Sequence, residues 1–159
     1  MQSLEKYPRH TLIIGVGNEY RHDDGVGLVI AQALKQKSMP HVTIIEATGD
    51  GAVLIDTWIH YERVIIIDAV ASGAVPGTLH QINVDERPLP TEFLTHSTHT
   101  FGVAEAIELA RTLICLPPNL LFFGIEGEDF TLGPGLSASM ERAVPVLIDN
   151  IGKILSCSD

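Results

Sequence analysis

Residues 11–27, TLIIGVGNEYRHDDGVG, decide the fold of this chain. The apolar run at residues 12–14 is typical of a strand that is buried on both faces of a parallel sheet. The GVGN sequence that follows lets the backbone turn tightly, because glycine has no Cβ to clash. Apolar residues spaced i, i+3, i+4, i+7 and i+8 over residues 26–34 then predict a helix with one buried face. Two aspartates, Asp23 and Asp24, are therefore expected at the start of this helix.

The glycines of this stretch do not form a dinucleotide-binding fingerprint. A GxGxxG motif would need glycine at position 20, which is Tyr20, and a helix that begins within the glycine turn. Here two carboxylates precede the helix, and they would repel a phosphate at close range. The loop therefore suits a cation, or a group that carries one.

Length and composition set broad limits. The chain has 159 residues, 45% of them hydrophobic, so we expect one globular domain over residues 1–159. Ten Lys and Arg against 20 Asp and Glu give a net charge of -10. That balance argues against general binding of nucleic acid or anionic membranes, because both depend on basic patches.

Two further observations indicate the compartment. Residues 1–10 lack the apolar centre of a signal peptide, and no stretch approaches the roughly 20 apolar residues of a membrane span. Cys115 and Cys157 show no CxxC spacing, which argues against a disulfide framework and against a zinc site. We expect a cytoplasmic protein in which Cys115 is a small core residue.

Strands and helices are predicted to alternate along the rest of the chain. The predicted helices cover residues 51–60, a segment that starts at His99 and includes Ile114, and a closing segment after Ser137 as N-cap. The strands are expected at residues 42–46, 64–68, 78–84 and 120–125, with 78–84 antiparallel at an edge. This pattern predicts a three-layer α/β/α sandwich around a mostly parallel sheet of about five strands.

Three residues are candidates for a shared site at the carboxyl ends of the strands, where open parallel sheets bind ligands. Asp24 follows the first strand, Asp68 ends the third, and His99 precedes a helix that returns to the same edge. Two carboxylates and an imidazole suit a borderline divalent ion and leave positions open for water or substrate. Each residue also has a simpler interpretation: Asp23 and Asp24 as helix caps, Asp68 as the cap of a turn with Ser72, and His99 as an ordinary surface histidine.

The remaining acids and histidines have no predicted role. Glu126, Glu128 and Asp129 are expected to form a solvated loop. No GxSxG elbow exists, and neither cysteine lies in a setting that favours a thiolate nucleophile.

The chain resembles the maturation endopeptidases of [NiFe] hydrogenases. The resemblance is carried by the GVGN and DDGVG sequences at residues 15–27, by IIIDA at 65–69, by STHTFG at 97–102 and by GPGLS at 133–137. It implies that Asp24, Asp68 and His99 contact metal and take part in catalysis. It also implies an α/β/α sandwich that removes a short C-terminal extension from a hydrogenase large-subunit precursor. The nickel ion would arrive in that precursor.

The resemblance has one departure, and two other functions remain open beside it. The family often has Asp-Gly-Gly or Asp-Gly-Thr after the second strand, whereas residues 46–48 read Glu-Ala-Thr here. The first alternative is a metal-dependent hydrolase of a small substrate. The second is a non-catalytic protein that binds or checks a nickel site.

Overall fold

A computed structural model describes residues 10–94 and 101–157 of the chain. Its centre is a five-stranded sheet in the order β2-β1-β3-β5-β4. All neighbours pair in parallel except β4, which runs antiparallel to β5 at one edge. The strands are β1 (Thr11–Val16), β2 (Val42–Ala47), β3 (Arg63–Val70), β4 (Leu79–Asn83) and β5 (Asn119–Glu126). The predicted sheet, including its antiparallel edge strand, is confirmed.

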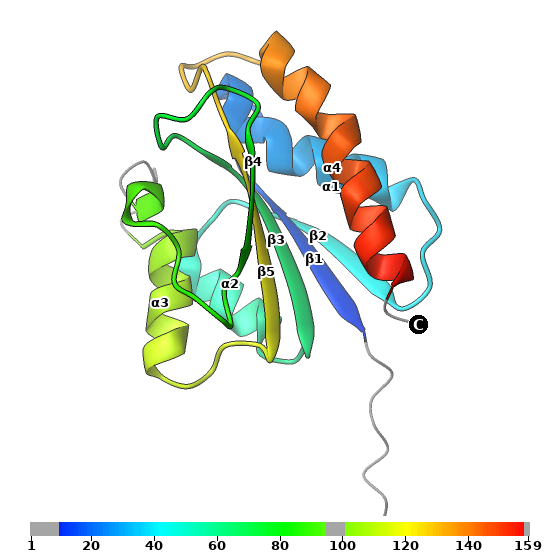
Figure 1. The fold of residues 1–159 in the computed structure, drawn as a ribbon, viewed down its shortest axis with the longest axis vertical. Helices are drawn as coiled ribbons and strands as arrows, with labels where there is room; N and C mark the ends of the chain where they lie inside the picture. Colours follow the sequence, from blue (N-terminus) through cyan, green and yellow to red (C-terminus); the bar gives the residue numbers. More distant parts are fainter. Residues whose placement is uncertain (1–9, 95–100, 158–159) are drawn as a thin grey trace, which may run out of the picture.

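Helices cover both faces of the sheet and make three layers (Figure 1). One face packs against α1 (Val26–Lys35) and α4 (Ala138–Ser156), and the other against α2 (Gly51–Trp58) and α3 (Val103–Thr112). Two short 3₁₀ helices, η1 (His22–Gly25) and η2 (Thr91–Leu94), complete the described elements. The α/β/α sandwich is therefore confirmed.

The central strands are buried because helices cover them on both sides. Ile13 and Ile14 of β1 and Ile65, Ile66 and Ile67 of β3 are each 0% exposed, as expected for unbroken apolar strands in a parallel sheet. The chain leaves β1 for β2 on one side and later returns to β3 on the other. The carboxyl ends of β1 and β3 thus form the point where strand order reverses, which is the usual ligand position in such sheets.

Close backbone packing fixes the start of α1 against these strand ends. A Cβ added at Gly27 would overlap the carbonyl oxygen of Val16 and lie 2.5 Å from that of Ile67. No larger residue fits there without moving the helix. The 3₁₀ turn η1, which carries Asp23 and Asp24, is thereby held above the ends of β1 and β3.

Three local predictions were wrong. Asp68 does not end its strand, because β3 continues to Val70. Ile114 is not on the buried face of α3: the helix ends at Thr112, and Ile114 is 95% exposed with a φ of 56°. The helical spacing of residues 51–60 also predicts that Val53 shares one side of the helix with Leu54 and Trp58, but Val53 of α2 is 57% exposed while the other two are buried. The predicted helix start at His99 lies outside the described residues.

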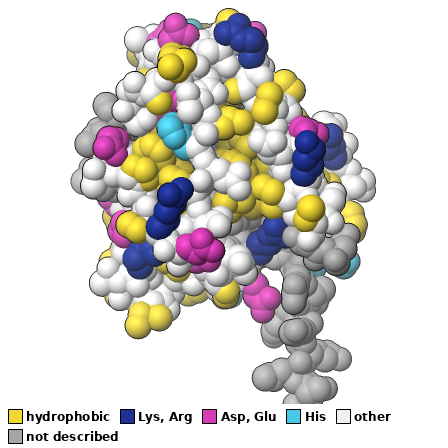
Figure 2. Space-filling model, in the orientation of Figure 1, with side chains coloured by type: hydrophobic (Ala, Val, Ile, Leu, Met, Phe, Trp, Pro, Cys, Tyr) yellow, Lys and Arg dark blue, Asp and Glu magenta, His cyan; other side chains and the backbone are white. Residues whose placement is uncertain are grey.

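Figure 2 has the same orientation as Figure 1, with the β4 edge of the sheet toward the viewer. Figure 2 shows charged side chains of both signs scattered around a central area of hydrophobic side chains. Among the described residues, none of the helices is long and apolar enough to cross a membrane.

Candidate active site

A small cavity of about 60 Å³ lies at the point where the strand order reverses. Its polar lining includes Asp24 from η1, Asp68 from β3 and Thr48 from the loop after β2. The rest of the lining is largely apolar: Val16, Gly17, Gly49, Ala69, Val70, Ala71, Leu89, Phe93, Val103, Ala104, Phe122 and Phe130. The structure therefore brings two of the three predicted site residues into one cavity.

Asp24 is positioned by the backbone of the glycine loop. Its N–H donates to the carbonyl of Arg21 at 3.1 Å, and its carbonyl accepts from the N–H of Asn18 at 3.2 Å. A Cβ at Gly17 would overlap that same carbonyl oxygen, so the loop can close over Asp24 only with glycine here. The motif at residues 15–27 thus shapes a turn that presents one carboxylate to the cavity.

Asp68 is half-buried and pairs in register with Gly124 of β5. Burial raises the pKa of its carboxyl well above the usual value, and the negative charge of Asp24 raises it further; a hydrogen bond from the Ala69 backbone only partly opposes them. Two carboxyl groups held this way share negative charge that a cation would neutralise. Ser72, the predicted partner of Asp68 in a turn cap, instead hydrogen-bonds to Glu126.

The third predicted residue, His99, lies outside the described residues. Within residues 10–94 and 101–157 there is no group of three His, Cys, Asp or Glu side chains that could hold a metal ion. The segment that follows His99 in the sequence is anchored close to the cavity, because the carbonyl of Phe101 accepts a hydrogen bond from the Gly51 N–H at 2.9 Å. Val103 and Ala104, which open α3, line the cavity itself.

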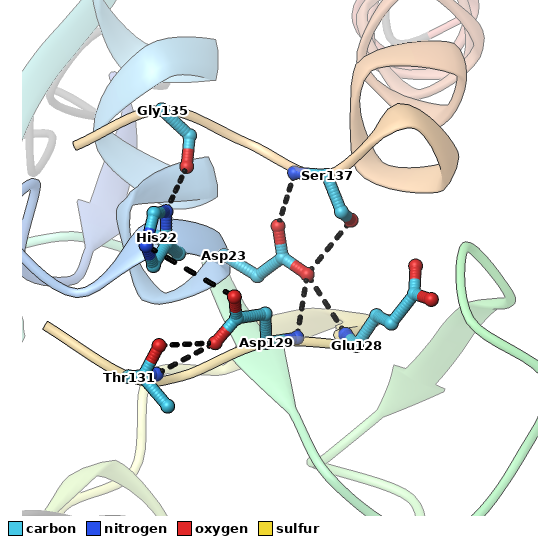
Figure 3. Close-up of polar contacts among 7 residues, drawn as sticks. All are labelled: His22, Asp23, Glu128, Asp129, Thr131, Gly135 and Ser137. Carbon is cyan, nitrogen blue, oxygen red and sulfur yellow. Dashed lines mark hydrogen bonds and ion pairs between the residues drawn. The ribbon is translucent and has the colours of Figure 1, made fainter. Parts of the chain in front are cut away.

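Asp23 is not the helix cap that the sequence predicted. It is 0% exposed, and its carboxylate binds the loop that precedes α4 (Figure 3). Oδ2 accepts from the N–H groups of Glu128 (2.8 Å) and Asp129 (3.1 Å), while Oδ1 accepts from that of Ser137 (2.7 Å). Ser137 is the N-cap residue of α4, as predicted, but its hydroxyl donates to Asp23 Oδ2 at 2.8 Å and makes no cap bond to the helix. Burial alone would raise the pKa of Asp23, but these hydrogen bonds outweigh it and hold the pKa below its usual value.

His22 adds a second link between the same segments (Figure 3). The backbone N–H of His22 donates to the carbonyl of Gly133 at 2.8 Å. The ring Nδ1 of His22 lies 3.1 Å from the carbonyl oxygen of Gly135. His22 and Asp23 together therefore fasten the Asp24 turn to residues 128–137. Asp23 faces the protein interior, whereas Asp24 faces the cavity. The sequence does not reveal this difference, because the two acids are adjacent.

Glu126 contradicts the prediction of a solvated acidic loop. It ends β5, is 2% exposed and accepts hydrogen bonds from Ser72 N–H (2.7 Å), Ser72 Oγ (2.7 Å) and Gly73 N–H (3.0 Å). His80 Nε2 lies 3.2 Å from its Oε2. Glu126 thus fixes the loop that follows the cavity-lining residues Val70 and Ala71.

The Glu-Ala-Thr departure also has a structural explanation. Glu46 lies within β2 and turns toward α1, where Gln32 Nε2 donates to it at 2.7 Å and Lys35 Nζ at 3.1 Å. The turn itself is made by Gly49, whose φ of 96° suits glycine. Gly49 thus supplies the glycine of this turn, and Thr48 and Gly49 line the cavity.

Comparison with known proteins agrees with the fold and identifies the family. Residues 28–154 match the hydrogenase maturation protease family, and the chain belongs to that family. The hydrogenase 2 maturation protease of Escherichia coli is 26% identical over 144 residues, covering 88% of this chain and 87% of that protein.

Solved structures show the same architecture. The hydrogenase maturating endopeptidase HybD from Escherichia coli superposes with a TM-score of 0.77 at 24% identity, over 94% of this chain and 93% of that one. The [NiFe] hydrogenase maturation protease HybD from Thermococcus kodakarensis superposes at 0.67 with 25% identity, over 92% and 99%. Of the three functions left open by the sequence, the peptidase is the one that these findings support.

Proposed function

We propose that this protein is an endopeptidase that removes a C-terminal extension from the large-subunit precursor of a [NiFe] hydrogenase once nickel has been inserted. The observation that carries the proposal is the meeting of Asp24 and Asp68 in one cavity at the carboxyl ends of β1 and β3. In this proposal the nickel ion belongs to the substrate.

Asp24, Asp68 and His99 are the proposed contacts for that ion and the proposed catalytic residues. Carboxylate and imidazole ligands suit a borderline divalent ion. The anchoring of Phe101, two residues after His99, supports a position for the histidine at the same cavity. A peptide bond held beside the ion would be attacked by a water that the ion or a carboxylate polarises. The reaction is thus aspartate-dependent without a covalent intermediate.

The two carboxyl groups also supply selectivity for the loaded precursor. Burial, and then the negative charge of Asp24, raise the pKa of Asp68, which supports a site where a cation stabilises the two ionised carboxylates. A precursor that brings a cation relieves this repulsion, whereas an empty precursor does not. The cytoplasm is the proposed compartment, supported by the two free cysteines, Cys115 and Cys157.

The test incubates the purified protein with nickel-loaded and nickel-free precursor and measures product masses. We expect truncation of the loaded form only, and none with Asp24→Ala, Asp68→Ala or His99→Ala. Equal cleavage of both precursor forms, or cleavage that survives these substitutions, would refute the proposal.

A further inference from the structure

A second hollow, larger than the carboxylate cavity and adjoining it, runs along the outer edge of β2. It has a volume of about 490 Å³. Its walls come from α1, through Leu28 and Gln32, and from α2, through Val53 and Thr57. Its floor is the edge strand itself, residues 45–47. We refer to it as the β2 groove.

The outer edge of β2 presents backbone hydrogen-bonding groups both in this groove, at Glu46, and along the part of the strand that leads to it. Thr11 N–H donates to His41 O, and Gly17 N–H donates to Ala47 O, each at 3.0 Å. Because backbone groups alternate sides along a parallel strand, the odd-numbered residues of β2 face β1. Val42, Ile44 and Glu46 therefore direct their N–H and C=O groups outward, and β2 has no second strand neighbour in the described part of the chain.

The groove is continuous with the candidate active site. Gly17 and Thr48 line both the β2 groove and the cavity that holds Asp24 and Asp68. Six residues of β2 give an edge about 20 Å long. An extended chain that pairs with β2 would therefore end beside the two carboxylates.

We propose that the β2 groove binds the C-terminal extension of the precursor as an added strand, in line with β-strand addition at other sheet edges. This inference rests on the proposed function. Main-chain hydrogen bonds to β2 supply affinity that is independent of sequence. Alternate side chains of the extension pack on the α1 wall and on the α2 wall, which includes the exposed Val53.

The shape and charge of the groove favour this occupant over others. A folded body cannot enter a slot between two helices, but a chain end can lie in it. A second copy of this chain that paired through β2 would bring a second set of the acids Glu19, Glu46 and Asp50 to this edge. Such a pairing of like charges, in a chain of net charge -10, opposes a dimer through β2.

The first experiment compares Val53→Arg with a matched control, Val146→Arg. Both valines are exposed on helices, at 57% and 52%, but Val146 lies on α4, away from the groove. With nickel-loaded precursor we expect Val53→Arg to weaken binding and raise KM by about tenfold or more, with a smaller effect on kcat. Val146→Arg should behave as wild type, and binding of the already processed subunit should be the same in both variants. Equal KM for the two variants would overturn the proposal.

A second pair of variants tests the backbone bonds directly. Ile44→Pro removes an outward N–H of β2 without breaking a bond to β1, and Gln81→Pro does the same on the opposite edge, β4. Only Ile44→Pro should raise KM. Amide hydrogen exchange should slow in β2, but not in β4, when wild type binds the full precursor. Slowing that is the same with the processed subunit, or that appears at high protein concentration without precursor, would contradict the proposal.

Different results would refute the proposed function and the proposed role of the β2 groove. A wild-type protein that does not cut the nickel-loaded precursor refutes the proposed function, and hydrogen exchange in β2 still decides whether the extension binds there. A protein that cuts the precursor with unchanged KM in both Val53→Arg and Ile44→Pro refutes the β2 groove alone.

Discussion

Burial raises the pKa of Asp68, and the charge of Asp24 raises it further, so the two carboxyl groups compete for a proton in one cavity. Asp24 lies on η1, after β1, and Asp68 lies near the carboxyl end of β3, and only the reversal of strand order between β1 and β3 brings them together. This arrangement costs stability when both groups are ionised. A cation at the site would remove that cost.

Asp68→Asn should abolish activity while making the protein more stable. An acid whose folded pKa is raised opposes folding once the pH exceeds its unfolded pKa near 3.8, so removing the charge raises the free energy of unfolding at pH 7. We expect cleavage of the loaded precursor to fall by about 10²–10⁴-fold. Thermal unfolding at pH 7 and pH 4 checks the stability change, which should shrink at the lower pH. A variant with a lower melting temperature at pH 7 would contradict this account.

Asp23→Asn should destabilise the protein, because an amide cannot accept all of the hydrogen bonds that the Asp23 carboxylate accepts. Its NH₂ group would face one of the N–H donors of Glu128, Asp129 or Ser137. The expected loss is about 1–3 kcal/mol, measured by urea unfolding. Glu128→Gln is the matched control, because it leaves the backbone N–H of residue 128 in place; an equal loss in that variant would show that the Asp23 network is not the cause.

Glu126→Gln should destabilise the protein in a pH-dependent way. Burial alone would raise the pKa of Glu126, but hydrogen bonds from Ser72, His80 and Gly73 hold it below its usual value near 4.5. Its ionised form therefore stabilises the fold above pH 4.5, and this stabilisation is lost as the pH falls through the lowered pKa. The difference from wild type should be about 1–3 kcal/mol at pH 7 and should narrow in acid. A pH-independent difference in unfolding free energy would argue against an ionised Glu126.

Gly27→Ala should displace α1 from the ends of β1 and β3. The added methyl group would overlap Val16 O, and overpacking of this kind costs about 1–3 kcal/mol. Activity should fall as well, since η1 and Asp24 move with the helix. Gly152→Ala is the control: nothing lies within 4 Å of the new Cβ, so this change within α4 should stabilise by about 0.5–1 kcal/mol. The two melting temperatures should move in opposite directions, and a parallel shift would be inconsistent with the packing described.

Much of the fold and part of the site could be predicted from sequence because they depend on strong local patterns. Unbroken apolar runs indicated β1 and β3, and parallel strands place their carboxyl ends at one edge. Asp24 and Asp68 were therefore expected to meet. The role of His99 remains a prediction that rests on the family resemblance and on the anchoring of Phe101.

Other features depend on contacts between distant segments, which a sequence pattern does not reveal. Asp23 and Glu126 were interpreted as a cap and a solvated acid, yet both are buried, because backbone N–H groups from other loops satisfy their carboxylates. Ile114 fitted the helical spacing, but α3 had already ended before it. In each case tertiary structure, rather than local preference, decided the outcome.

The contacts of Asp23 have a consequence for synthesis of the protein. The turn that carries Asp24 near the beginning of the chain is fastened by Ser137, which the ribosome adds much later. A nascent chain that ends before residue 137 lacks this fastening, so the turn that carries Asp24 is held in place only after Ser137 has been added.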